Sequence, residues 1–204
     1  MSAVQIIGIA ASISLLAGWR LYLCVFAVGL SMHLGWLAAP EHLKALSVFA
    51  NPWIIGIAGT GAIAEFLADK VMWIDSIWDA IHTLVRPVGG ALLALALVDA
   101  RDPAWQVATL LLGGGATLLT HGAKAGARAL INASPEPISN VIVSTGEDAV
   151  TASTLAAMIA SPVLGVPIAA ILIAIAVAAL LWLRRVLRTP IPWLRTRKSP
   201  TSPP

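Results

Sequence analysis

The sequence predicts an all-α membrane protein with about six transmembrane or partly re-entrant helices, some of them broken. Of its 204 residues, 58% are hydrophobic and only 11% are charged, whereas a soluble domain carries roughly 25% charged residues. The mean hydropathy is +0.87. These values exclude a soluble enzyme, a disordered chain and a disulfide scaffold, and we expect the single Cys24 to be a packed thiol.

The first apolar segment covers residues 3–37 and is interrupted by Arg20 and a few small polar side chains. It is too long for one untilted helix, because a span needs about 20 residues. Gly18 lies where a break is expected. We therefore expect a half-length helix up to about Leu16, a full span over Trp19–Leu37, and then a loop over 33–51. The basic region of a cleaved signal peptide is missing before Arg20, so this segment is expected to belong to the mature protein.

The next segments lead into charged residues. Trp53–Ala64 begins a span that runs into Glu65, and Ala104–Thr120 forms another. Pro87–Val98 supplies only 12 apolar residues. It reaches membrane length only if Ile74–Arg86 is helical as well.

The last third of the chain contains one apolar span without charges and a second that charged residues interrupt. Val163–Leu183 is free of charge over 21 residues. Ile138–Ala160 is interrupted by Gly146–Asp148, and Ser134–Pro137 contains two prolines and is expected to be a turn. We expect residues 1–188 to form a single polytopic domain.

A disordered, basic and proline-rich tail is expected over residues 189–204. Six of the 13 Lys and Arg residues lie in the last 21 positions. The positive-inside rule places such a cluster in the cytoplasm and explains it without nucleic-acid binding. The expected location is the bacterial inner membrane, crossed several times.

Four of the apolar segments carry polar side chains on one helical face. These four stripes are Glu65 and Asp69; Asp75, Asp79, His82 and Arg86; His121, Lys124 and Arg128; and Asn140, Ser144 and Glu147, bordered by Asp148. An ionised group that faces lipid costs about 2.5–3.5 kcal/mol. The stripes must therefore point toward one another or toward water.

The charges of the stripes are complementary. The carboxylates Glu65 and Asp69 could meet the cations Lys124 and Arg128, while Glu147 and Asp148 could oppose Arg86. Helical spacing also predicts that Asp79 meets His82, and His82 meets Arg86. Six carboxylates exceed the four cations Lys70, Arg86, Lys124 and Arg128. The excess must be hydrated, protonated or neutralised by a bound cation.

Glycine and proline near these charges have two interpretations. Gly113–Gly115 and Pro87–Gly90 could allow close helix packing, or they could mark discontinuous helices whose backbone faces a substrate. Residues 1–100 and 104–188 would each hold three segments. A weak internal repeat of inverted topology is therefore one interpretation of the chain.

At these residues the sequence resembles a bacterial membrane family catalogued as domain of unknown function 4126. The resemblance is carried by A-E-F-L-A-D-K (64–70), D-S-I-W-D-A-I-H-T-L-V-R-P (75–87), the segment 121–140, and G-E-D (146–148). Gly18–Arg20 resembles the G-x-R element of that family. The resemblance covers most of residues 10–185 and implies an architecture and these residues, but no reaction.

The stripes favour a transporter or channel whose path they line. Its substrate would be a small ion or an anionic molecule such as a lipid phosphate, with Asp79 and His82 as a proton or cation relay and Lys124 and Arg128 as an anion-binding pair. The alternatives are a structural or accessory membrane subunit, with homo-oligomerisation, and a lipid-modifying enzyme in which Asp75, Asp79 and His82 hold a divalent metal. No organic cofactor is expected.

Overall fold

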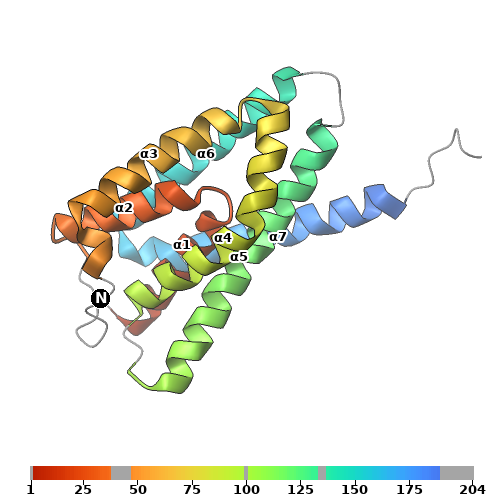
Figure 1. The fold of residues 1–204 in the computed structure, drawn as a ribbon. Coiled ribbons are helices and arrows are strands. Elements are labelled where there is room, and N and C mark those ends of the chain that lie inside the picture. Colours follow the sequence, from red (N-terminus) through yellow and green to blue (C-terminus); the bar gives the residue numbers. More distant parts are fainter. Residues whose placement is uncertain (1, 38–46, 99–100, 133–136, 189–204) are drawn as a thin grey trace, which may run out of the picture.

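All regular elements of the described residues are helical, which confirms the all-α prediction. The computed structural model describes residues 2–37, 47–98, 101–132 and 137–188 (Figure 1). The α-helices in these ranges are α1 (Ala3–Ala17), α2 (Leu21–His33), α3 (Pro52–Ala68), α4 (Met72–Leu97), α5 (Pro103–Asn132), α6 (Pro137–Ala160) and α7 (Gly165–Arg188). A 3₁₀ turn, η2 (Pro162–Leu164), precedes α7. The predicted tail over 189–204 lies outside the described residues.

The short helix α1 is the centre of the bundle, and it contacts α2, α4, α5, α6 and α7. It begins with a capping box, in which Ser2 and Gln5 each bond the other's backbone N–H. Most of its side chains from Gly8 to Ala17 are buried. Its end at Ala17 confirms the predicted half-length helix with a break at Gly18.

The helix after the break is shorter than predicted. We expected a full span over Trp19–Leu37, but α2 has only 13 residues, a length of about 20 Å. The cause is a Schellman motif at its end. There Gly35 adopts a φ of 74°, and Trp36 N–H donates to the Ser31 carbonyl at 2.9 Å. Of the loop expected over 33–51, the structure describes both ends, including a 3₁₀ turn at 47–50.

Helices α4, α5 and α6 are continuous through the positions where breaks were considered. α4 runs through Pro87 and bends along its length in Figure 1, as expected for a helix with an internal proline. α6 runs through Gly146–Asp148 without a break, so the two acidic residues interrupt the apolar stretch but not the helix. Gly90 of α4 and Gly113 of α5 serve packing, since a Cβ at Gly113 would lie 3.0 Å from the Gly90 carbonyl oxygen.

Within the described ranges, two helices are long and apolar enough to cross a membrane. They cover Trp73–Leu97 and Pro162–Arg188, with mean hydropathies of 1.6 and 2.8. Helices α1, α2 and α3 are apolar but shorter. The predicted turn at 134–136 lies outside the described residues, and Pro137 is the first residue of α6. The six-span topology and the inverted repeat stay predictions.

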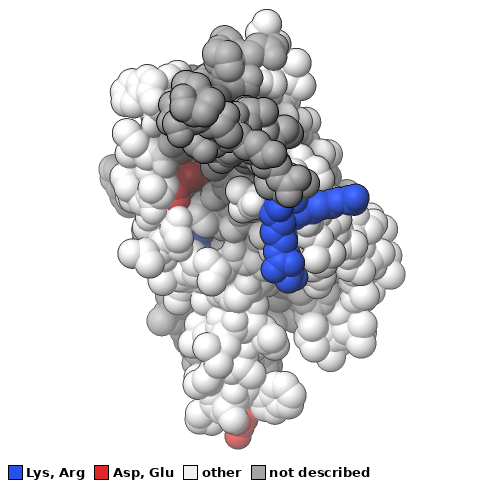
Figure 2. Space-filling view, turned by 90° about the vertical axis from the view of Figure 1, so that its right-hand side faces the viewer, with Lys and Arg blue, Asp and Glu red and all other residues white. Residues whose placement is uncertain are grey.

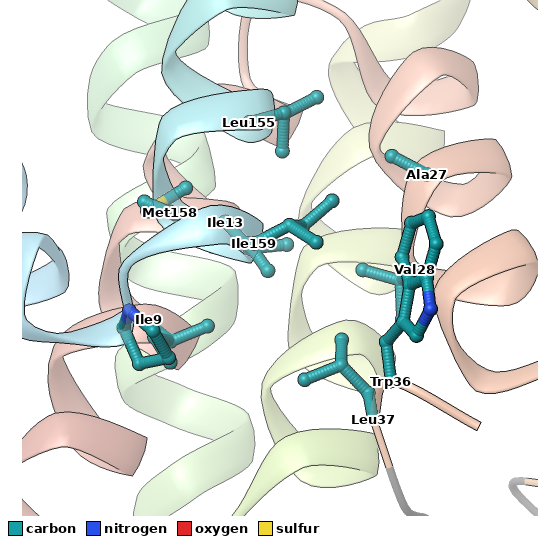
Figure 3. A pocket seen from close by; sticks show the side chains of 10 residues that line it. Ile9, Ile13, Ala27, Val28, Trp36, Leu37, Leu155, Met158 and Ile159 are labelled. Carbon is teal, nitrogen blue, oxygen red and sulfur yellow. The ribbon is translucent and has the colours of Figure 1, made fainter. Parts of the chain in front are cut away.

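The described surface carries few charges on the face drawn in Figure 2, where Lys and Arg side chains gather at one place. Arg184, Arg185 and Arg188 are exposed at the end of α7. Figure 3 shows a cavity of about 40 Å³ that α1, α2 and α6 help to line with apolar side chains such as Ile13, Val28 and Met158. Its lining is mostly apolar and includes the indole ring of Trp36.

Candidate functional site

The four stripes point into the bundle and meet near the break between α1 and α2. The buried charged and polar members are Glu65, Asp69, Asp75, Asp79, His82, Arg86, His121, Lys124, Arg128, Asn140 and Ser144. Glu147 and Asp148 are half-buried. Spacing on a helix thus identified the inward faces correctly. We call this set, together with Arg20 and Lys70, the charge network.

Asp69, the C-terminal cap of α3, is the hub of the network. Its Oδ2 lies 3.0 Å from Lys124 Nζ and 3.6 Å from Arg128 Nη2, and it also accepts a hydrogen bond from Arg20. Its backbone carbonyl accepts from Asn140 Nδ2 at 3.0 Å. The predicted meeting of Asp69 with Lys124 and Arg128 is therefore present.

Arg86 has different partners from those predicted. Its guanidinium lies 2.8 Å from Glu65 Oε1 and 3.0 Å from Asp79 Oδ1, and it donates to the Gly18 carbonyl at 3.2 Å. The expectation that Glu147 and Asp148 oppose Arg86 is wrong. Arg86 lies well inside α4, beside the break between α1 and α2, where Glu65 reaches it from α3.

Glu147 and Asp148 form the outer edge of the network instead. Glu147 Oε2 lies 2.9 Å from Arg128 Nη2 and 3.8 Å from Lys124 Nζ. Asp148 lies 2.7 Å from Arg20 Nε and 2.8 Å from Lys70 Nζ. The side chains of Glu147 and Asp148 are 16% and 20% exposed, so solvent reaches the network here.

The two histidines of the network are both buried. His82 does not form the predicted pair with Asp79: its Nδ1 donates to the Trp78 carbonyl at 2.7 Å, and its Nε2 lies 3.1 Å from the Tyr22 hydroxyl. One turn of helix brings the Trp78 carbonyl closer to that nitrogen than any carboxylate, while Asp79 bonds Arg86.

His121 takes the place beside Arg86 that the spacing assigned to His82. Arg86 Nη1 donates to His121 Nδ1 at 2.7 Å, and His121 Nε2 lies 3.0 Å from Thr83 Oγ1. Because the guanidinium can only donate, Nδ1 is an acceptor and Nε2 carries the proton. His121 is therefore a neutral member of the network.

Sequence reasoning missed Arg20 as a member of the network. Arg20 is 2% exposed and lies within 4 Å of Asp69, Glu147 and Asp148. The signal was present, because Arg20 is the one charged residue in the apolar segment 3–37. With Arg20 included, the network has five cations and six carboxylates. The predicted excess of negative charge therefore falls from two to one.

Three carboxylates of the network leave one buried oxygen without a hydrogen-bond partner in the described part of the protein. These oxygens are Glu65 Oε2, Asp69 Oδ1 and Asp79 Oδ2. A buried acceptor of this kind is costly unless water, a proton or an ion satisfies it. Among the described residues, the Nε atoms of Arg20, Arg86 and Arg128 likewise lack a hydrogen-bond partner, so the network offers both acceptors and donors to water or to a bound group.

The predicted metal site is not formed. No group of three or more His, Cys, Asp or Glu side chains within the described ranges could hold a metal ion. Asp75 turns toward Arg128 at 3.6 Å, Asp79 toward Arg86, and His82 toward Trp78. The three side chains thus diverge to different partners.

In the residues that the structure describes, the fold and site define an all-helical protein with a buried, branched ion-pair network beside the break between α1 and α2. The chain matches the family described as "Domain of unknown function (DUF4126)" over residues 7–182 and belongs to that family. No curated protein and no solved structure matches the chain.

Proposed function

We propose that the chain is a multi-pass membrane transport protein and that the charge network is the path of a small cation, in its simplest form a proton. A membrane location is supported by the large apolar side chains exposed along the bundle. Trp53, Leu84 and Leu112 are each at least 74% exposed. In water so much exposed apolar surface would drive aggregation, whereas lipid covers it at no cost.

The packing of α5 against α7 supports a proposed orientation. Gly126 lies between Lys124 and Arg128, and a Cβ there would lie 3.6 Å from Leu183 Cγ. Leu183 directly precedes Arg184 and Arg185. The network thus lies at the level of the basic end of α7, which the positive-inside rule assigns to the cytoplasm. The proposal is an inner-membrane protein of a bacterial cell, with a cytoplasmic C-terminal tail.

On the other side of the network, helix α1 closes the proposed cation path. Ile9, Ile13 and Leu16 are buried in the apolar core of the bundle. α1 meets the network at Gly18 and fills the remaining depth with these side chains. This arrangement favours a transporter that is open toward one side rather than a continuous open channel.

The charge balance favours a cation over an anion, and it is the observation that carries the proposal. Six carboxylates and five cations leave one negative charge, which one added proton or small cation would neutralise. Lys124 and Arg128, considered above as an anion-binding pair, already contact Asp69 and Glu147. A lipid phosphate would have to displace these carboxylates from Lys124 and Arg128, whereas a cation could bind to the carboxylates without displacing either residue.

A cation can advance through the network by exchange of partners. Glu65, Arg86, Asp79, Lys124 and Asp69 form a chain of alternating charge, with successive contacts of 2.8, 3.0, 3.8 and 3.0 Å. Protonation of one carboxylate would release its cation to the next. The half-exposed Glu147 and Asp148 give this chain an entrance on the cytoplasmic side.

The test is flux into proteoliposomes that contain the purified chain. A potassium gradient with valinomycin drives H⁺ uptake, read by an internal pH-sensitive dye, and Na⁺ and K⁺ are tested separately. We expect flux that Asp79→Asn and Glu147→Gln reduce at least tenfold. Asp102→Asn is the matched control, because Asp102 is exposed and caps α5 by accepting from Ala104 N–H.

A second candidate, a structural or accessory subunit, is favoured by the pairing of every network cation with a carboxylate. Ion pairs of this kind can hold a bundle together without conducting anything. Variants that stay folded but lose flux support the path. Variants that unfold on single substitution, together with no flux in the unchanged protein, would contradict transport and support the structural role.

A further inference from the structure

Three arginines near the C-terminal end of α7 form a basic surface outside the charge network. Helix α7 ends at the right-hand side of the bundle in Figure 1, and Figure 2 looks onto that side, where Lys and Arg side chains gather. Arg184, Arg185 and Arg188 are all exposed. In the described part of the protein none of the three pairs with a carboxylate, whereas Lys124 and Arg128 are buried and paired. Their positive charge is thus available to an anion.

The three arginines lie where a bilayer has its headgroups. Helix α7 has no charged residue from Gly165 to Leu183, and it rises about 28 Å over this stretch. The hydrocarbon core of a bilayer is about 30 Å thick. In the proposed membrane this part of α7 is therefore long enough to fill the hydrocarbon, and Arg184 begins the part that meets the lipid phosphates.

The same arginines lie on the face of α7 that points away from the bundle. At 100° per residue the three arginines and Leu181 fall within an arc of about 100°. Buried residues of α7 such as Leu172 and Ala176 lie on the opposite side. The residues that precede the arginines on the outer face are exposed and apolar: Ala174, Val177, Ala178 and Leu181. The outer face is therefore an apolar strip that leads directly to three guanidinium groups.

We propose that this outer face binds one anionic phospholipid of the cytoplasmic leaflet, an inference that rests on the proposed membrane location and orientation. The guanidinium groups donate paired hydrogen bonds to the oxygens of the phosphate. One acyl chain lies along the apolar strip, where the small side chains of Ala174 and Ala178 leave room for it. A zwitterionic phospholipid makes the same apolar contact, but the arginines repel its positively charged group.

The test is native mass spectrometry of the full chain in detergent with added lipid. Dioleoyl phosphatidylglycerol is the anionic probe, and dioleoyl phosphatidylcholine is a zwitterionic lipid with the same acyl chains. We expect phosphatidylglycerol to bind at least tenfold more tightly. Arg184→Gln, Arg185→Gln and Arg188→Gln together (the α7 variant) should remove most of this preference, because each basic residue near an anionic lipid contributes about fivefold.

The matched control removes the same charge elsewhere. Arg195→Gln, Arg197→Gln and Lys198→Gln together take three positive charges from the sequence that follows α7. We expect this variant to weaken phosphatidylglycerol binding at least threefold less than the α7 variant does. Thermal unfolding in detergent checks that both variants are folded, and the α7 variant should melt like the unchanged protein because its three side chains are exposed.

Three results would overturn the proposal. Equal binding of the two lipids would mean that the apolar strip accepts any acyl chain. Equal effects of the two variants would assign the preference to the net charge of the chain and not to the outer face of α7. Displacement of the lipid by inorganic phosphate would indicate a site for a soluble anion.

Lipid binding and transport are read in separate measurements. Selective binding of phosphatidylglycerol without H⁺ flux in proteoliposomes supports the lipid site and rejects transport. Network-dependent H⁺ flux without selective binding rejects the lipid site and leaves transport standing. Recovery of the chain from the soluble fraction of cells would reject the membrane location on which both depend.

Discussion

Arg20, in the break between α1 and α2, bonds Asp69, the C-terminal cap of α3, although 49 residues separate them. Both side chains are almost completely buried. The pair joins the end of α1, the start of α2 and the end of α3. It thereby connects the charge network to the centre of the bundle. The break between α1 and α2 thus brings the backbone ends of these helices to the buried charges that α4, α5 and α6 carry along their continuous length.

Removal of the Arg20 charge should destabilise the protein strongly. Arg20→Met leaves Asp69 and Asp148 without their nearest guanidinium contact, and loss of one partner of a buried ion pair costs about 3–5 kcal/mol. Thermal unfolding in detergent measures the effect. Arg188→Met, at the exposed end of α7, should leave the melting temperature unchanged. Equal melting temperatures for Arg20→Met and the unchanged protein would contradict the buried pairing.

Gly18→Ala should disrupt the break between α1 and α2. A Cβ at Gly18 would lie 2.5 Å from the Thr117 carbonyl oxygen and 2.8 Å from His121 N, and these backbone atoms cannot move without displacing α5. We expect the free energy of unfolding to fall by about 1–3 kcal/mol or more, as it does when a core is overpacked. Gly56→Ala is the control, because a Cβ there meets nothing within 4 Å and alanine favours a helix by about 0.5–1 kcal/mol. If both variants melt alike, α1 and α5 are not in close contact.

The basic end of α7 and the start of α5 should lie on opposite sides of the membrane. Cys24 is buried, so the unchanged protein should not react with a membrane-impermeant maleimide. Arg188→Cys should be labelled in inverted vesicles, and Trp105→Cys in intact cells, because α5 extends about 30 Å from Trp105 to Lys124. Labelling of both from the same side would reject the proposed orientation.

Divalent metal removal should leave the protein unaffected. Asp79 is directed to Arg86 and His82 to Trp78, so these side chains do not converge on one ion. We expect EDTA, Mg²⁺ and Zn²⁺ to shift the melting temperature by less than about 1 °C, since an ion that binds only the folded state would raise it measurably. A stabilising shift that Asp79→Asn and His82→Gln both remove would restore the metal hypothesis.

Local patterns in the sequence determined the helical class, the break at Gly18 and the faces that carry the charged stripes. Asp75, Asp79 and Arg86 share one buried side of α4 because each residue turns the helix by 100°, a property of the helix alone. The apolar stretches that became α3, α5 and α7 were visible for the same reason.

Tertiary structure alone decided the continuity of α4 through Pro87 and the partners of Arg86. Spacing on one helix cannot tell at what depth a neighbouring helix presents its own charges. Glu65 reaches Arg86 because α3 ends beside the break after α1, while Glu147 is held near the surface by Arg128. Ion pairs join atoms only a few ångströms apart, so the relative depth of the helices selects each partner.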